Sequence, residues 1–112
     1  IHKKINACIQ IKVSSEDAKS GCDPCSLIDI ADLIKSMKNI NLKGIMALPK
    51  LTDNIKEQKK VMELIMGLSK KLQKHYPDAK IISLGTTLDF EEAIINGSTM
   101  VRIGESIFGK RL

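Results

Sequence analysis

Hydrophobic residues alternate with polar ones along the first stretch of the chain. From Lys4 to Val13, an apolar residue stands at every second position from Ile5 onward. A period of two is typical of a β-strand. The polar stretch from Ser14 to Pro24, which contains a glycine, predicts a loop after this strand.

Two later stretches carry apolar residues at helical spacing. The first extends from Ser26 to Lys38. The second is longer and extends to about Tyr76 from a cap at Thr52 or Asp53. Its inward face is expected to hold Ile55, Val61, Met62, Leu64, Ile65, Leu68 and Leu72.

Short apolar runs predict three more strands. The predicted elements are strands at Leu42–Leu48, Lys80–Leu84 and Thr99–Ile103, a helix at Asp89–Ile95 and a helical turn at Glu105–Phe108. Strands that alternate with helices favour an α/β fold with parallel strands and right-handed crossovers. The whole chain is then one domain, either a small open sheet or half of an eight-stranded barrel.

Two of these strands end in turns that favour the binding of an anion. Ile81 and Ile82 are expected to break at Ser83-Leu84-Gly85, and the last strand breaks at Gly104. A turn from a buried strand into a helix points backbone N–H groups outward. Barrels often bind phosphate in the loops after strands seven and eight. If these four strands are strands five to eight, the two turns predict a phosphate site.

Composition limits the classes of partner. The chain has 112 residues, of which 43% are hydrophobic and 28% charged, so a globular domain is expected. No apolar run is long enough to cross a membrane. The net charge is +5, but there are only two arginines and 3% aromatics. This favours a solvated lysine surface, with some attraction for small anions, over a nucleic-acid site.

Three cysteines, Cys8, Cys22 and Cys25, form an odd count. Together with the lack of a recognisable export signal, this favours free thiols in a reducing cytoplasm. The spacing of Cys22 and Cys25 is that of a redox or metal pair. A structural zinc site needs two further ligands nearby, so no metal site is assigned, and chance pairing in a loop is the favoured interpretation.

Several segments together carry a family resemblance. They are Gly44-Ile45-Met46-Ala47-Leu48-Pro49, Ser83-Leu84-Gly85 with Asp89, and Gly97 to Gly109 with its Val101-Arg102-Ile103-Gly104 core. These residues resemble the YggS/PROSC family of pyridoxal phosphate (PLP) homeostasis proteins. The resemblance covers essentially the whole chain and corresponds to the second half of a family member. It implies the C-terminal half (1–112) of a PLP-binding (β/α)8 barrel like the N-terminal domain of alanine racemase.

The resemblance implies a role for four residues. The Ser83 hydroxyl would bond the PLP phosphate, the backbone N–H groups of Gly104 and Glu105 would cradle it, and Arg102 would lie against the pyridine nitrogen. A permanently charged guanidinium keeps that nitrogen unprotonated, which weakens the ring as an electron sink. The structural alternatives are a strand-end cap for Ser83 and an ion pair for Arg102. No lysine is assigned as the covalent anchor of PLP.

Two positions depart from the family pattern. Thr86 stands where members usually carry methionine after Ser-x-Gly, and Glu105 stands where many carry a small hydroxyl residue. A carboxylate has no proton to donate at pH 7 and repels a dianion. Weaker phosphate binding is therefore expected.

The resemblance implies a non-enzymatic PLP carrier that passes PLP to PLP-dependent apoenzymes. An amino-acid racemase is the first alternative, but it needs a second acid/base, and the only tyrosine is Tyr76. A truncated remnant without PLP function is the second. As a free chain, half a barrel exposes both strand edges. Dependence on a missing N-terminal half, or self-association, is therefore expected.

Overall fold

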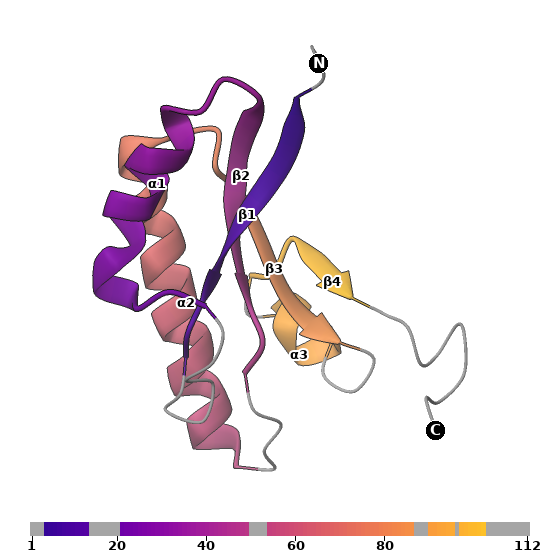
Figure 1. Ribbon diagram of the computed structural model, residues 1–112. Coiled ribbons are helices and arrows are strands. Elements are labelled where there is room, and N and C mark those ends of the chain that lie inside the picture. Colours follow the sequence, from indigo (N-terminus) through magenta and orange to yellow (C-terminus); the bar gives the residue numbers. More distant parts are fainter. Residues whose placement is uncertain (1–3, 14–20, 50–53, 87–89, 96, 103–112) are drawn as a thin grey trace, which may run out of the picture.

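The computed structural model describes residues 4–13, 21–49, 54–86, 90–95 and 97–102 (Figure 1). Its elements follow the predicted alternation of strands and helices. They are β1 (Ile5–Ile11), a 3-10 turn (Pro24–Ser26), α1 (Leu27–Lys35), β2 (Ile40–Ala47), α2 (Ile55–His75), β3 (Ile81–Thr86), α3 (Phe90–Ile95) and β4 (Met100–Arg102). All neighbouring strands are parallel, in the order β1-β2-β3-β4. The predicted helical turn at Glu105–Phe108 lies outside the described residues.

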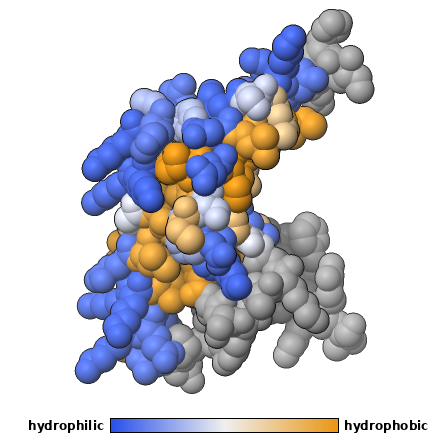
Figure 2. Space-filling view, turned by 60° about the vertical axis from the view of Figure 1, so that its left-hand side comes forward, coloured by the Kyte–Doolittle hydropathy of each residue, from blue (hydrophilic) through white to orange (hydrophobic). Residues whose placement is uncertain are grey.

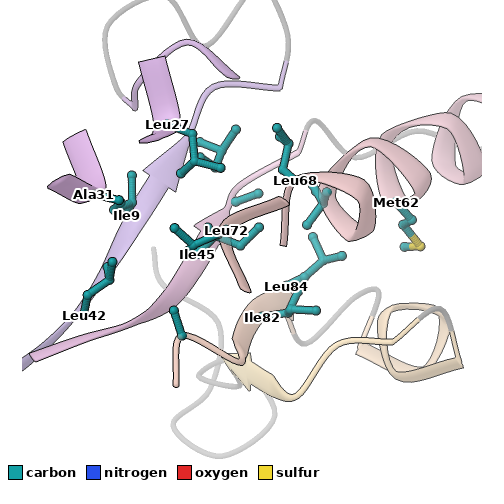
Figure 3. Close-up of a cluster of buried hydrophobic side chains, with 14 of the residues drawn as sticks. Ile9, Leu27, Ala31, Leu42, Ile45, Met62, Leu68, Leu72, Ile82 and Leu84 are labelled. Atoms are coloured by element: carbon teal, nitrogen blue, oxygen red, sulfur yellow. The ribbon is translucent and has the colours of Figure 1, made fainter. Parts of the chain in front are cut away.

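The core lies between the sheet and its helices. Helices α1 and α2 pack side by side on one side of the sheet (Figure 1), and α3 contributes Ala93 to the same core. Ile9, Ile45 and Ile82 occupy one register row across β1, β2 and β3 and are all buried. Figure 3 shows these side chains converging with Leu68 and Leu72 of α2. Burial of this apolar row against the helices is the main stabilising term of the fold.

Helix α2 begins later than its sequence indicates. Asn54 is the N-cap, because its side-chain oxygen accepts hydrogen bonds from the N–H groups of Lys56 (3.0 Å) and Glu57 (3.3 Å). The predicted cap at Thr52 or Asp53 was therefore wrong. Asparagine is as good an N-cap as threonine or aspartate. Asn54 takes this role because it stands immediately before the first turn of the helix.

Two residues that were expected to face inward on α2 are exposed. Ile55 is 69% exposed and Leu64 is 42% exposed, whereas Ile65 is completely buried. Ile55 is the first residue of the helix, and little of the rest of the fold lies close enough to cover its side chain. Leu64 lies about 100° around the helix from Ile65, which places it at the margin of the buried stripe.

Strand β3 does not break where its sequence suggests. The predicted break at Ser83-Leu84-Gly85 was wrong, because β3 continues to Thr86. Ser83 pairs with Met46 on one side and with Met100 on the other. Leu84 is fully buried on the helix side, and this long-range burial keeps the chain extended where serine and glycine would locally favour a turn.

Hydrophobic surface remains outside this core. Figure 2, with the side carrying α1 and α2 brought forward, shows hydrophobic surface in the middle of the molecule between hydrophilic areas. The large apolar side chains that stay exposed in the described residues are Ile5, Leu33, Met37, Leu48, Ile55, Leu64, Ile94, Ile95 and Met100. Two of them, Ile5 and Met100, lie on β1 and β4, the two outer strands of the sheet.

A polar contact joins α1 to the end of α2. The Tyr76 hydroxyl donates a hydrogen bond to the Asp32 carboxylate, and the Lys35 ammonium lies 5.8 Å from the centre of the Tyr76 ring. The hydrogen bond to Asp32, followed by partial desolvation and the charge of that carboxylate, raises the pKa of Tyr76. Ionisation of Tyr76 would therefore break the contact and oppose folding.

We expect this contact to make stability depend on pH in the alkaline range. The folded pKa of Tyr76 is raised, so its contribution is fully present below the ordinary value of about 10 and is lost as the pH rises through the folded value. Urea unfolding followed by circular dichroism at neutral and alkaline pH measures this loss. Tyr76→Phe should lose less stability than the unaltered chain over the same alkaline interval. Equal losses would contradict the assignment.

Candidate functional site

The face of the sheet opposite the helices carries a row of residues from all four strands. Gln10, Met46, Ser83 and Met100 are register neighbours from β1 to β4. Side chains alternate between the two faces of a strand. Since the preceding residues in β1, β2 and β3 belong to the core, this row lies on the other face. Ser83 therefore points away from the helices.

Ser83 is a buried polar residue with an unused hydroxyl. The side chain is only 4% exposed, and no hydrogen-bond partner of its hydroxyl occurs in the described part of the chain. Ser69, the other buried polar residue there, accepts a hydrogen bond from Gln73 Nε2 at 2.9 Å. A buried hydroxyl without a partner is costly, by about 1–3 kcal/mol. Among the described residues the Ser83 hydroxyl therefore stays without a partner, and its predicted bond to a phosphate oxygen stays a prediction.

Two hydroxyl residues before β4 attach that strand to β3. The Ser98 hydroxyl donates to the Leu84 carbonyl at 2.6 Å, and the Thr99 hydroxyl accepts from the Ile82 N–H at 2.7 Å. The Thr99 N–H also donates to the Ile82 carbonyl at 3.0 Å. These bonds flank Ser83 on both sides along β3. Ser98 and Thr99 therefore position the site, a role that the sequence interpretation did not assign.

Arg102 is the last residue of β4. Its backbone pairs with Thr86 at the end of β3, so the structure brings Arg102 and Ser83 to neighbouring strands near the carboxyl edge of the sheet. The predicted contact of its guanidinium with a pyridine ring stays a prediction. Gly104 and Glu105 lie outside the described residues, and their predicted backbone contacts with phosphate also stay predictions.

The three cysteines lie on or beside β1: Cys8 is within the strand, and Cys22 pairs with its last residue. Cys22 forms a parallel bridge with the end of β1, and Cys25 is exposed in the 3-10 turn before α1. Burial raises the pKa of the Cys8 and Cys22 thiols, which makes their reactive thiolate forms scarcer. All three thiols are free. Among the described residues, no three histidine, cysteine or acidic side chains gather as metal ligands would.

In the described ranges, none of the helices combines the length and the apolar character that crossing a bilayer requires.

The fold and the site define a class of protein. Four parallel strands backed by helices on one face, with a buried serine hydroxyl on the other that has no partner among the described residues, match part of a (β/α) barrel. The model of the family described as "Alanine racemase, N-terminal domain" matches residues 2–111. The chain belongs to this family.

Comparison with curated proteins gives a more specific similarity than the family model does. The pyridoxal phosphate homeostasis protein of Pasteurella multocida is 42% identical over 111 residues, which cover 97% of this chain and 48% of the relative. The chain spans about half the length of the curated relatives that it matches. The resemblance to PLP homeostasis proteins that the motifs indicated is confirmed.

Solved structures confirm the fold. PipY of Synechococcus elongatus, solved with PLP bound, superposes with a TM-score of 0.80 at 22% identity, over 96% of this chain and 50% of PipY. Alanine racemase of Corynebacterium glutamicum gives a TM-score of 0.68 at 17% identity, over 97% of this chain and 30% of the racemase. The predicted α/β fold, part of a (β/α)8 barrel, is confirmed. That the chain forms the C-terminal half remains a prediction.

Proposed function

We propose that this chain binds PLP and serves PLP homeostasis as a non-catalytic carrier in the cytoplasm, passing PLP to PLP-dependent apoenzymes. The observation that carries the proposal is the Ser83 hydroxyl, which is buried on the face away from the helices and has no partner in the part of the chain that the structure describes. A phosphate oxygen supplies the acceptor that this hydroxyl lacks. The names of the curated relatives, and PLP in the PipY structure, support the choice of PLP among phosphorylated ligands.

The chain's own residues would hold PLP at two ends. Ser83 donates to a phosphate oxygen, and the backbone N–H groups of Gly104 and Glu105 share the phosphate. Arg102 faces the pyridine nitrogen and keeps it unprotonated because the guanidinium does not give up its charge. When bound, PLP supplies an aldehyde that reacts with amines. The weak electron withdrawal of an unprotonated ring suits storage and transfer of the cofactor.

The position of Tyr76 favours the carrier over a racemase. A racemase needs a second acid/base close to the bound substrate. Tyr76, the only tyrosine, lies at the end of α2 and donates its hydroxyl to Asp32 of α1. Both groups belong to the helix layer, on the other side of the sheet from the face that carries Ser83. Tyr76 therefore cannot act at the proposed site without a large rearrangement.

Binding of PLP and of pyridoxal, which lacks the phosphate, tests the proposal by isothermal titration calorimetry. Ser83→Ala should weaken PLP binding about 10-fold or more, because it removes a hydrogen bond to a charged group, and should leave pyridoxal binding unchanged. Ser69→Ala is the matched control: this serine is equally buried but bonds Gln73 of its own helix, so PLP affinity should not change.

Three other results would contradict the proposal. Absence of PLP binding would favour a remnant without PLP function. Equal losses in the Ser83 and Ser69 variants would show that the effect is structural. Racemisation of L-alanine by the PLP-loaded protein would establish the racemase instead. Mass spectrometry after borohydride reduction shows separately whether any lysine of this chain takes up PLP.

Glu105 offers a second prediction at the same site. If its carboxylate repels the phosphate dianion, Glu105→Ser should raise PLP affinity by about 5- to 10-fold at low ionic strength. Added salt should shrink this gain, because it screens the repulsion. Glu91→Ser, which removes an exposed carboxylate on α3, is the control and should have little effect. An unchanged affinity in Glu105→Ser would mean that its side chain points away from the phosphate.

A further inference from the structure

Helix α2 carries most of the positive charge of the chain. It contains six lysines and two glutamates, which give the helix +4 of the chain's net charge of +5. All six lysines are exposed; they are Lys56, Lys59, Lys60, Lys70, Lys71 and Lys74. In Figure 1, α2 extends along one side of the sheet, so a long basic surface lies on the outside of the helix layer.

The six lysines share one side of α2 and define its lysine face. At 100° per residue they fall within an arc of about 120°, opposite the buried stripe whose centre is Ile65. From Lys56 to Lys74 this arc is about 27 Å long. Glu63 is the one acidic residue of α2 inside the arc, whereas Glu57 lies at its margin. The lysine face is therefore nearly uniform in charge.

The lysines of this face repel one another. Lys56 and Lys60, like Lys70 and Lys74, are four positions apart, a spacing at which like charges destabilise a helix. Lys56 also lies in the first turn, where the helix dipole disfavours a positive charge. Within the part of the chain that the structure describes, none of the six ammonium groups has an ion-pair partner. A negatively charged surface would relieve this repulsion.

The residue types on the lysine face indicate the class of partner. Protein interfaces are enriched in arginine and aromatic residues and depleted in lysine. Surfaces that bind single-stranded nucleic acid combine basic residues with aromatic rings on which bases stack. Helix α2 contains no arginine, phenylalanine, tyrosine or tryptophan. Lysine is a flexible point charge, and four or more lysines on an amphipathic helix are typical of binding to anionic lipid headgroups.

We propose that the lysine face of α2 docks on the anionic headgroups of a phospholipid membrane. The helix then lies along the bilayer surface with its ammonium groups among the headgroups. Because the apolar side of α2 stays in the protein core, the attachment is electrostatic and reversible, without insertion. Ser83 lies on the other side of the sheet and so faces away from the membrane. The proposal does not depend on PLP and is tested without it.

Co-sedimentation with lipid vesicles gives the first test. The chain should bind vesicles of phosphatidylcholine that contain about 30% phosphatidylserine, and should not bind phosphatidylcholine alone. Raising the salt from about 0.05 to 0.2 M should weaken binding to the anionic vesicles about 10-fold or more, because salt screens the charges. Equal binding to both kinds of vesicle, or binding to neither, would overturn the proposal.

Charge-removing variants test which lysines make the contact. The test variant combines Lys70→Gln, Lys71→Gln and Lys74→Gln. It should bind the anionic vesicles about 100-fold more weakly, since each lysine near the surface contributes about 5-fold. The control removes the same charge from exposed lysines outside α2 and combines Lys4→Gln, Lys38→Gln and Lys80→Gln. It should lose about 5-fold or less. Equal losses in the two variants would overturn the proposal.

A variant with a gain of binding keeps the proposal testable if the lysine variants do not fold. Glu63→Gln removes the negative charge inside the lysine face and should strengthen binding to the anionic vesicles about 5-fold. Glu91→Gln, which removes an exposed carboxylate on α3, is the control and should bind like the unaltered chain. Unchanged binding of Glu63→Gln would overturn the proposal.

Two other anionic probes separate the membrane from competing partners. A DNA duplex of about 20 base pairs and a glutamate homopeptide are each titrated against the same chain at the same salt concentration. Both should bind more weakly than the anionic vesicles. Tighter binding of either probe, lost in the variant without Lys70, Lys71 and Lys74, would overturn the proposal and assign the lysine face to nucleic acid or to an acidic protein. PLP binding is measured separately, so the two proposals can fail independently.

Discussion

Replacing Gly44 with alanine should unfold most of the chain. Gly44 has a φ of +154°, and a Cβ at this position would clash with the carbonyl oxygen of Ile81 in β3. This is backbone, so it cannot rotate away as a flexible side chain would. The strain and the forced separation of two central strands should lower the free energy of unfolding by about 3 kcal/mol or more.

The position of Gly44 in the sheet explains this severity. A bulge lies beside it, because Ala7 pairs with Leu42 whereas Cys8 pairs with Gly44, which leaves Lys43 as the additional residue. Urea unfolding followed by circular dichroism measures the loss. Gly67→Ala is the matched control, because nothing lies within 4 Å of its added Cβ and it stands within α2. That variant should gain about 0.5–1 kcal/mol. Equal stability of the two variants would show that β2 and β3 can separate freely.

The second large effect is expected at Ile65. Its side chain is completely buried in the core between α2 and the sheet, so Ile65→Ala should lower the free energy of unfolding by about 2–5 kcal/mol. The neighbouring Leu64→Ala removes a side chain of the same size that is 42% exposed, and about 1 kcal/mol or less is expected. The same urea experiment measures both. Similar losses at the two positions would mean that α2 is rotated from the orientation described.

The order and type of the helices and strands could be predicted because the local sequence pattern determines them. The alternation along β1 and the helical spacing in α1 and α2 follow directly from which face each element buries. The end of β3 could not be predicted in this way. Ser83 and Gly85 carry local turn preferences, and only the burial of Leu84 under the helices, a tertiary effect, outweighs them.

The residues of the candidate site were predicted from family motifs more than from the hydrophobic and polar pattern of the sequence. The resemblance pointed to Ser83, but the burial of its side chain depends on the register of three strands, which no local pattern records. The attachment of β4 through Ser98 and Thr99 was missed for the same reason. Their hydrogen bonds to β3 join residues fourteen or more positions apart, and the local signal is a pair of hydroxyl residues before a strand.

The bridge between Cys22 and the end of β1 also bears on solubility. A parallel sheet with a long bare edge is a template for unlimited growth into fibrils. Here the chain covers part of its own first edge with Cys22. Short edges hold too few hydrogen bonds to nucleate a stack of many chains. The bridge at Cys22 therefore lowers the tendency of this edge to nucleate amyloid-like aggregation.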